Sequence, residues 1–486
     1  NAHQPQEGPV AFYEAHLQSE QGWNMLGGLF PGGCLIFHGT NENLGWAHTV
    51  NYQDKLDVFQ LEINPNNKNQ YKFDGEWIDL EKDKAKLKVK GIPITIGKKI
   101  YWSKYGATVK TDKGVFSLRV PATMDIKALE EWYRMNKAKN FTEFYSALSM
   151  TSLPMFNVMY ADRYDTIFYI SNGKIPVRNP DPKYNWKSTI AGNTSNTLWT
   201  TFKPVQQLPQ YVNPPSGYLY NTNHSPFLAT DKKYNLDPKK FDRNDGYETY
   251  HNNRSQRVTE LINNEKIDYS TFKKIKFDQQ LPKELKYIYG IDSMLNLNAG
   301  DYPALKDMIA TLQNWDRKAV INSKGAAIFL LVYDYVSKKL VGTPARQLTR
   351  AESIEAYQYV YDYMIKNFDK TDLVLGDIQK LVRGDDARPA WGLPDVLTAE
   401  YTEPYKDGMR KIISGDAYIC FVRYPKDGSL PIIESVNTFG TSMHPDSPHY
   451  KDQMAMFLNQ QAKPMTLDKA TVLKSAEKVY HPIKGN

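Results

Sequence analysis

Cysteine is scarce in this chain of 486 residues, which contains only Cys34 and Cys420. Both lie in apolar runs, so we expect two buried free thiols, with a disulfide between them as the alternative. Long apolar runs are absent as well, because no stretch approaches the roughly 20 residues that cross a bilayer. The sequence therefore predicts no membrane span. No signal peptide is visible at residue 1, and a processed or truncated chain would show none.

Arginine is the minority cation of this chain. Only 14 of the 61 basic residues are arginine, and the 54 acidic residues leave a net charge of +7. Lysine is the poorer choice for bidentate recognition of phosphates and bases, and no basic cluster is interleaved with aromatic side chains. We therefore predict no nucleic-acid partner and attribute the charge to a solvated surface.

The signatures of several enzyme classes are also missing. The nucleophile elbow Gly-x-Ser-x-Gly is absent, and residues 440–444 (GTSMH) are its nearest miss. The chain has no His-Glu-x-x-His motif, no Walker loop and no dinucleotide fingerprint. Its nine histidines lack the spacing of zinc ligands. The sequence accordingly predicts no organic cofactor.

The chain does contain ample apolar and aromatic material. Hydrophobic residues make up 41% and charged residues 24%, a balance typical of globular proteins that bury a large core. Aromatic residues reach 13%, and there are 28 prolines. This combination favours a broad sheet joined by ordered loops.

Periodic patterns predict strands first and helices later. Alternation predicts antiparallel hairpins over residues 85–120, and helical spacing predicts helices at 125–138 and 141–150, the second with Asn140 as its N-cap. Paired strands are expected at 156–162 and 166–170.

After residue 175 the predicted secondary structure changes several times along the chain. Residues 175–250 are predicted to form a long irregular crossing, residues 251–384 to be mainly helical with one apolar helix at 325–338, and residues 385–410 to be an irregular insertion. Strands return at 417–423 and 432–436. Because strands lie at both ends with helices between them, we predict one interleaved α+β body over residues 1–486, with a helical insertion at about 251–384.

Three polar runs carry a family resemblance. They are NLGWAHTVN at residues 43–51, SGYLYNTNHSP at residues 216–226 and the closing GTSMHPDSPHYKDQ at residues 440–453. In this order they resemble segments of the penicillin acylase family of N-terminal-nucleophile hydrolases, in style nearest to its acyl-homoserine lactone acylases. The tail carries Thr441 where the family usually has glutamine, and we interpret it as architectural.

The resemblance implies an αββα sandwich, in which two antiparallel sheets packed face to face are covered by helices. It also implies a precursor that cuts itself into an α and a β chain, with a serine at the start of the β chain. Since residue 1 is Asn1, we expect this chain to be a β chain that lacks its first short stretch, with an α chain as its partner. Periplasmic or exported location in a bacterium is implied by the resemblance alone.

The resemblance assigns four catalytic residues. The Val50 backbone N–H and the Asn223 side chain would form an oxyanion hole, whose donors are fixed before the reaction starts. His3 would orient the serine, and Arg257 would brace Asn223. Each has an ordinary structural alternative, respectively a strand end, a turn asparagine, a hydrogen-bonded histidine and a surface arginine.

A structural calcium ion is a further expectation from the resemblance. Asp54, the Leu56 carbonyl and Asp57 match a calcium-binding segment of penicillin acylases, and carboxylates with a carbonyl suit a hard cation. Two carboxylates three residues apart are also common on protein surfaces, so a solvated pair is the alternative.

The expected acyl pocket is hydrophobic around Phe37 and Phe156 and partly polar because of His38 and His48. A long-chain acyl-homoserine lactone, an aryl-acetyl β-lactam and another small-molecule acyl amide all remain open as substrates. The alternative to an amide hydrolase is a catalytically inactive ligand-binding protein that retains the acylase scaffold.

Overall fold

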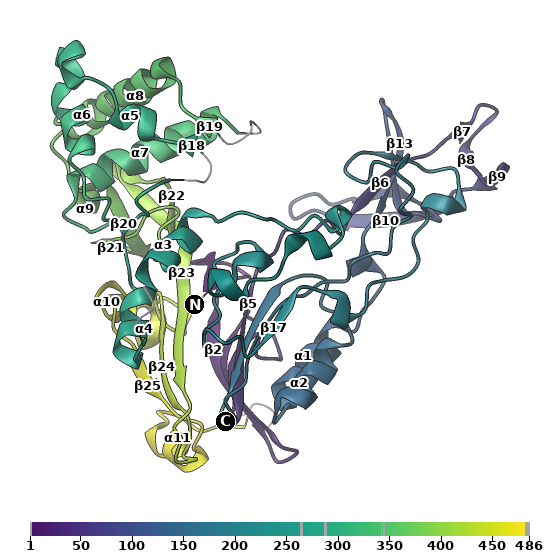
Figure 1. Ribbon diagram of the computed structural model, residues 1–486, viewed down its shortest axis with the longest axis horizontal. Helices are drawn as coiled ribbons and strands as arrows, with labels where there is room; N and C mark the ends of the chain where they lie inside the picture. The colour runs from purple at the N-terminus through teal and green to yellow at the C-terminus, as the bar shows by residue number, and fades with distance from the viewer. Residues whose placement is uncertain (1, 263–265, 286–288, 342, 344–345, 482–486) are drawn as a thin grey trace.

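The computed structural model describes residues 2–262, 266–285, 289–341, 343 and 346–481. Two seven-stranded sheets lie next to each other at its centre, and helices cover their outer faces (Figure 1). The predicted α+β class and the αββα arrangement are therefore confirmed.

The first sheet, called sheet A, is built around one long strand. Its order is β21-β20-β23-β24-β25, and β1 and β22 also pair with β23. All of these pairs are antiparallel except β20 with β23, a departure from the fully antiparallel sheet that the resemblance implies. The strands are β1 (Ala2–Pro5), β20 (Gln379–Arg383), β21 (Asp386–Pro389), β22 (Glu400–Pro404), β23 (Arg410–Arg423), β24 (Ile432–Asn437) and β25 (Lys463–Met465).

The second sheet, called sheet B, has the order β17-β15-β14-β5-β4-β3-β2 and is antiparallel throughout. Burial alternates along β5, because successive side chains point to opposite faces of a strand. The strands are β2 (Tyr13–Ser19), β3 (Trp23–Leu29), β4 (His38–Thr40), β5 (Leu44–Thr49), β14 (Asn157–Asp162), β15 (Ile167–Ser171) and β17 (Gln210–Val212). The predicted pairing of the two strands near 156–170 is confirmed by β14 and β15.

Helices α1 (Ala128–Lys137) and α2 (Phe141–Leu148) pack on the outer face of sheet B. The Asn140 side chain accepts a hydrogen bond from the Glu143 N–H, which confirms the predicted N-cap of α2. On the opposite side, α4 (Tyr269–Lys276) and α10 (Met454–Leu458) cover sheet A, where Phe421 and Phe457 belong to one apolar cluster.

The predicted hairpins over 85–120 belong to a third sheet of six strands, which lies beyond sheet B (Figure 1). The strands are β6 (Asp57–Gln60), β10 (Glu81–Lys88), β11 (Thr95–Ser103), β12 (Gly106–Thr111), β13 (Gly114–Arg119) and β16 (Ile190–Ala191). A smaller sheet is formed by β7 (Ile63–Asn64), β8 (Asn67–Phe73) and β9 (Glu76–Asp79). Strand β6 follows β5 closely in the sequence. The six-stranded sheet that contains β6 therefore holds the chain in place after it leaves sheet B.

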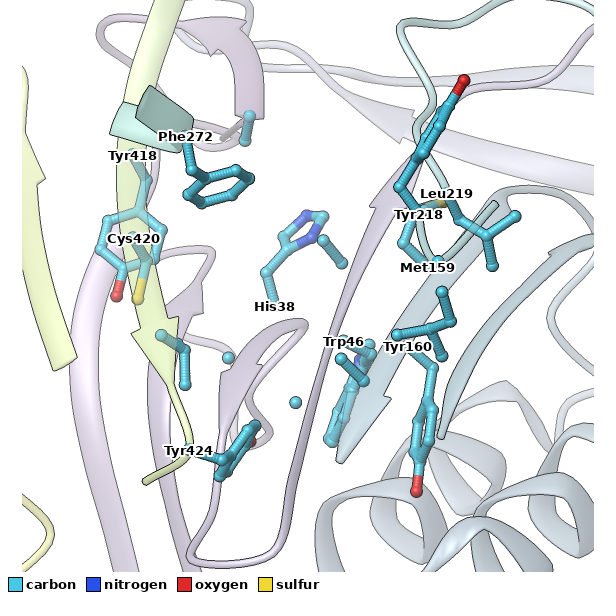
Figure 2. A pocket seen from close by; sticks show the side chains of 18 residues that line it. His38, Trp46, Met159, Tyr160, Tyr218, Leu219, Phe272, Tyr418, Cys420 and Tyr424 are labelled. Carbon is cyan, nitrogen blue, oxygen red and sulfur yellow. The ribbon is translucent and has the colours of Figure 1, made fainter. Parts of the chain in front are cut away.

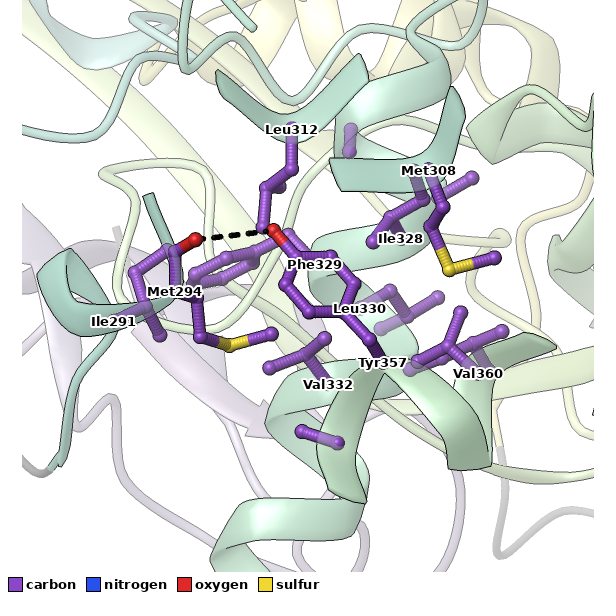
Figure 3. Close-up of a cluster of buried hydrophobic side chains, with 14 of the residues drawn as sticks. Ile291, Met294, Met308, Leu312, Ile328, Phe329, Leu330, Val332, Tyr357 and Val360 are labelled. Carbon is purple, nitrogen blue, oxygen red and sulfur yellow. Dashed lines mark hydrogen bonds between the residues drawn. The ribbon is translucent and has the colours of Figure 1, made fainter. Parts of the chain in front are cut away.

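Residues 253–378 contain most of the helices of the described chain. Ile328 and Leu330 on the apolar helix α7 contact Tyr357 and Val360 on α8 within one buried cluster (Figure 3). The helices are α3 (Asn253–Leu261), α5 (Asp292–Leu295), α6 (Lys306–Gln313), α7 (Lys324–Lys339), α8 (Arg350–Phe368) and α9 (Leu375–Ile378), with short strands β18 (Tyr289–Gly290) and β19 (Arg346–Gln347). Helix α3 and the already described α4 differ from the other helices of this region because they reach the space between the two central sheets.

Two expectations are wrong in detail. Residues 385–410 are not irregular, since β21 and β22 pair within sheet A. Both cysteines are free, but Cys34 is exposed, because it lies in a turn after β3 instead of in a strand.

The crossing at 175–250 is mostly short turns, as expected. Its 3-10 turns are η2 (Ser195–Thr197), η3 (Val205–Gln207), η4 (Pro226–Leu228), η5 (Lys232–Tyr234), η6 (Pro238–Lys240) and η7 (Arg243–Asp245). Elsewhere lie η1 (Pro121–Thr123), η8 (Ala299–Asp301), η9 (Pro303–Leu305), η10 (Lys406–Gly408), η11 (Pro448–Tyr450) and α11 (Lys469–Ser475). Within the described residues, none of the helices has both the length and the apolar character of a membrane span.

Glu131 on α1 links stability to pH. It is fully buried and accepts the backbone N–H groups of Ser152 at 2.6 Å and Leu153 at 2.9 Å. Burial raises the pKa of Glu131 to about 8 against these opposing hydrogen bonds. The folded pKa lies above the unfolded value, so the folded state binds more protons and loses stability as the pH rises from the unfolded pKa to the folded one.

We therefore expect the free energy of unfolding to fall by about 3 kcal/mol between pH 5 and pH 8 through this one group. Urea titrations of the wild type and of Glu131→Gln at several pH values measure the effect. The variant should lose that part of the slope, whereas Glu130→Gln, at an exposed neighbour, should keep it. Parallel slopes for wild type and Glu131→Gln would contradict the prediction.

Candidate active site

A cavity of about 350 Å³, called the donor cavity, opens between the sheets where β1 begins. Val50 at the end of β5 and Asn223 from the irregular crossing both line it, together with Ala2 and His3 of β1. Helix α3 contributes Arg254 to the same wall. The fold thus brings three sequence-predicted residues, Val50, Asn223 and His3, to one place.

Val50 and Asn223 are in direct contact. The Asn223 side chain donates from Nδ2 to the Val50 carbonyl oxygen at 2.9 Å. The Val50 N–H has no hydrogen-bond acceptor among the described residues. An amide Nδ2 carries two hydrogens, so one remains for a ligand, and the cavity has a backbone donor and a side-chain donor side by side.

The backbone at Asn223 has a left-handed conformation, with φ of 58°. Asparagine tolerates this region better than most residues. The turn is fixed by the Asn221 side chain, which accepts the Asn223 N–H at 2.9 Å, and by Asn252, which donates to the Asn223 carbonyl at 3.1 Å. These contacts fix the backbone from which the carboxamide projects.

The arginine that braces Asn223 is Arg254, and the prediction of Arg257 is wrong. Arg254 donates from Nη2 to Asn223 Oδ1 at 3.0 Å, which directs the carboxamide oxygen away from the cavity and leaves the NH₂ group toward Val50. Arg257, one turn later on α3, pairs instead with Asp278 at 2.8 Å and Glu260 at 3.0 Å. Both arginines lie on one helix, and only the tertiary contacts distinguish them.

His3 acts on Arg254. Its Nδ1 lies 3.2 Å from Arg254 Nη1, and its Nε2 lies 2.8 Å from Asp416 Oδ1 on β23. Burial lowers the pKa of His3, and the opposing effect of Asp416 is smaller. A neutral ring that accepts at Nδ1 carries its proton on Nε2, which faces the Asp416 carboxylate.

Asp416 is fully buried, and Lys276 of α4 donates to its second oxygen at 2.6 Å. Burial alone would raise the pKa of Asp416, but Lys276 and His3 together hold it below its ordinary value. Asp416, His3 and Arg254 therefore form a relay that ends on Asn223. Arg254, Asp416 and Lys276 carry no sequence motif of their own, and sequence reasoning missed all three.

The four expected pocket residues separate into two groups. His38 and His48 line the donor cavity, whereas Phe37 and Phe156 lie against Trp132, with ring centroids 4.6 Å and 6.3 Å from it. Phe156 has a φ of 101°, a strained value for a bulky residue and one that is often found at functional sites. Trp132 was not predicted.

A second cavity of about 390 Å³, called the inter-sheet cavity, adjoins the first. Figure 2 shows the His38 ring between Tyr418 and Cys420 of β23 on one side and Met159 and Tyr160 of β14 on the other. On the edge of β23 that β1 occupies, residues 419–423 pair with no described strand. This unpaired part of β23, called the open edge, borders the inter-sheet cavity.

The three expected calcium ligands do not fit a bound cation. The Arg178 guanidinium lies between them, donating to Asp57 Oδ2 at 2.9 Å and to Asp54 Oδ1 at 3.1 Å. Trp199 donates to the same Asp57 oxygen at 2.7 Å, and Leu56 is exposed. Within the described part of the chain, no cluster of three metal-ligating side chains occurs. Arg178 supplies the positive charge that the prediction assigned to calcium.

Comparisons with known proteins identify similar sequences and a similar fold. The model of the penicillin amidase family matches residues 1–474. The acyl-homoserine lactone acylase PvdQ of Pseudomonas syringae pv. tomato is 23% identical over 510 residues, which cover 94% of this chain and 65% of that protein. Penicillin G acylase of Escherichia coli is 26% identical over 202 residues, covering 40% of this chain and 23% of its own length.

The fold has a match among solved structures. The thermostable penicillin G acylase from Alcaligenes faecalis superposes with a TM-score of 0.69 at 17% identity, over 99% of this chain and 95% of that chain. At this identity the likeness concerns the fold alone. This chain spans 65% of the length of the first curated relative that it matches.

Proposed function

Because the chain belongs to the penicillin amidase family, we propose that it forms a large part of an amide hydrolase that removes an acyl group from an amine. The observation that carries the proposal is the convergence of Val50 and Asn223 on the donor cavity. Donors that are fixed in advance stabilise the charge that develops on a carbonyl oxygen during acyl transfer. Relatives named for penicillin G and acyl-homoserine lactone acylase activity support the same reaction class.

The proposed nucleophile is the hydroxyl of a serine at the start of the mature chain, in a segment ahead of Ala2. Strand β1 runs antiparallel to β23, with Ala2 opposite Tyr418. A segment that continued β1 backward would pair with the open edge, because an antiparallel partner advances along β23 as the chain is followed toward its start. The open edge supports the proposal by offering a rigid place from which a serine could reach the donor cavity.

In the proposed reaction the serine Oγ forms a bond to the substrate carbonyl carbon, and the carbonyl π electrons move onto the oxygen. The Oγ proton passes through a water to the α-amine of the same serine, whose unperturbed pKa of about 7.7–8.0 suits a base near neutral pH. When the intermediate collapses, the C–N bond breaks and the ammonium returns the proton to the leaving amine. Water then attacks the acyl ester, its proton reaches the serine oxygen through the same amine, and the acid leaves.

Each residue of the donor cavity has a separate task in this scheme. The Val50 N–H and the free hydrogen of Asn223 Nδ2 would donate to the oxyanion. Arg254 is a positioning residue that fixes the orientation of Asn223, and its charge favours a neutral, basic α-amine nearby. His3 and Asp416 hold Arg254, so we assign His3 to the oxyanion hole and not to the serine.

Family membership supports three further proposals. An α chain cut from the same precursor would complete the protein, self-cleavage would create the terminal serine, and export to the periplasm would precede activity. The gene ahead of Asn1 tests all three, since it should encode a serine shortly before His3, preceded by a spacer, an α chain and a signal peptide.

A panel of amides tests the activity. The full-length, processed protein should release amine from at least one class among acyl-homoserine lactones, aryl-acetyl β-lactams and simple acyl amides. Inhibitors that acylate the serine should abolish the release. If no amide is cleaved although processing is confirmed, the proposal of an amide hydrolase is wrong. The alternative, a catalytically inactive ligand-binding protein with the acylase scaffold, is then favoured.

The two arginines of α3 form a matched test of the relay. Arg254→Leu should lower kcat about 10- to 100-fold with little change in KM, because it removes a charged hydrogen bond that positions a transition-state donor. Arg257→Leu should lower Tm through the lost pairs with Asp278 and Glu260 while kcat stays near that of the wild type. Equal losses of kcat in the two variants would contradict the assignment.

A further inference from the structure

Two histidines lie beside the oxyanion donors and have no part in the mechanism above. His38 of β4 and His48 of β5 line the donor cavity together with Val50 and Asn223. Their rings meet edge to face, with centroids 5.3 Å apart. Figure 2 shows the His38 ring projecting into the space between the sheets. An acyl group whose carbonyl reaches Val50 would lie in the cavity that this pair lines.

Hydrogen bonds fix the tautomer of both rings. The His48 backbone N–H donates to His38 Nδ1 at 2.9 Å, so His38 Nδ1 is an acceptor and its proton sits on Nε2. Trp132 Nε1, which can only donate, lies 2.9 Å from His48 Nε2, so the proton of His48 sits on Nδ1. Each ring therefore offers one N–H, at His38 Nε2 and at His48 Nδ1.

Both rings are neutral. Burial lowers the pKa of His48 to about 3, and burial together with the neighbouring His48 lowers the pKa of His38 well below its ordinary value. Their ring neighbours are aromatic: Phe12 is 5.2 Å from His38, and Phe156 is 5.2 Å from His48. The nearby cations are already paired, Arg254 with Asn223 and Lys276 with Asp416. A carboxylate at this place would find no free positive charge among these groups.

The two N–H donors lack protein acceptors. His48 Nδ1 is buried without a hydrogen-bond partner, and no described residue accepts from Nε2 of the half-buried His38. A buried donor left unpaired costs the desolvation of that group, whereas an acceptor supplied by a ligand removes the cost. A fully apolar acyl chain would leave both donors unpaired.

Building on the proposed amide hydrolase activity, we propose that His38 and His48 select acyl groups that carry an uncharged oxygen acceptor, such as a keto or hydroxyl oxygen, close to the scissile carbonyl. The acceptor oxygen takes the His38 Nε2–H, because His48 Nδ1 is enclosed and the His48 backbone N–H holds the His38 ring in place. The remaining chain packs among the aromatic rings. This makes the pair specificity-determining residues of the acyl site.

A series of acyl amides with one common leaving amine tests the proposal on the full-length, processed protein. The acyl chains have equal length and carry no oxygen, a keto or hydroxyl group at successive carbons, or a terminal carboxylate. At the best position the keto or hydroxyl substrate should exceed the unsubstituted one about 10- to 100-fold in kcat/KM, which corresponds to one buried hydrogen bond. The carboxylate substrate should be the poorest.

Two variants of His38 identify the donor. His38→Phe should abolish the preference and raise kcat/KM for the unsubstituted chain, whereas His38→Gln, which keeps an N–H donor, should retain part of it. His444→Phe, at an exposed histidine outside the cavity, should leave the preference unchanged. These ratios compare substrates on one enzyme, so a loss of folded protein does not affect them.

The outcomes separate the inference from the proposed function on which it rests. If no substrate of the series or of the wider amide panel is cleaved, the proposed function fails. If amides are cleaved but oxygen gives no advantage, or if His38→Phe keeps the advantage, the inference alone fails. A preference for the carboxylate would equally overturn the neutral-donor assignment.

Discussion

Replacing Asn223 by glycine is expected to lower kcat about 10²- to 10³-fold, the loss typical of one oxyanion-hole donor. Glycine is the cleanest choice because the backbone at Asn223 has a φ of 58°, which glycine adopts without strain, whereas alanine would add a folding defect. The carboxamide contacts only Val50 and Arg254 among the hydrogen bonds of its side chain in the described structure. KM should therefore change little, and Tm should stay close to that of the wild type.

Steady-state kinetics on the preferred amide, with circular dichroism for folding, measure this effect. Asn66→Gly, in an exposed turn, is the matched control and should retain full activity. Asn223→Asp should be at least as damaging as glycine, because it replaces a donor by a negative charge that pairs with Arg254 and faces the oxyanion. An Asn223→Gly enzyme with wild-type kcat would remove Asn223 from the oxyanion hole.

Replacing Arg178 by alanine is expected to lower the free energy of unfolding by about 3–5 kcal/mol, as breaking a buried ion pair does. The Arg178 side chain is 2% exposed and that of Asp57 is fully buried. Without the guanidinium, the Asp57 carboxylate keeps only the Trp199 N–H among the side-chain donors of the described residues. Adding Asp57→Asn to the variant should recover part of the loss, because it removes the buried unpaired charge.

The arrangement of Arg178, Asp54 and Asp57 also predicts that the stability of the protein does not depend on calcium. Since Arg178 occupies the position between Asp54 and Asp57, EGTA should leave Tm unchanged and added calcium should not raise it. Arg346→Ala, which breaks the more exposed pair with Glu352, should cost less than about 1 kcal/mol and serves as the control. A Tm that falls with EGTA and recovers with calcium would contradict this prediction and show that the protein binds the cation.

The sequence predicted those features that depend on local pattern. Alternation located the paired strands β14 and β15, and the N-cap at Asn140 followed from helix-start chemistry. Val50 and Asn223 were selected because each lies in a specific run of residues, and the fold brings both residues to one cavity. Local patterns and distinctive runs of residues can be recognised without knowledge of the tertiary contacts.

The features that the sequence did not predict depend on partners distant along the chain. Arg254 and Arg257 are chemically equivalent in sequence, and only the positions of Asn223 and Asp278 distinguish them. Asp54 and Asp57 have the spacing of cation ligands, yet Arg178 comes from a segment outside that motif. Likewise, Trp132 lies on a helix whose pattern gives no sign of the ring against Phe37.

The relay from Asp416 through His3 and Arg254 to Asn223 joins groups from both ends of the chain and from its middle. Contacts between such distant residues close large loops, which makes them slow to form during folding. Isolated fragments of the chain would hold the asparagine and the backbone amide in separate, disordered segments. The proposed amide cleavage should thus reappear only at the last stage of refolding, and incompletely folded molecules should lack it.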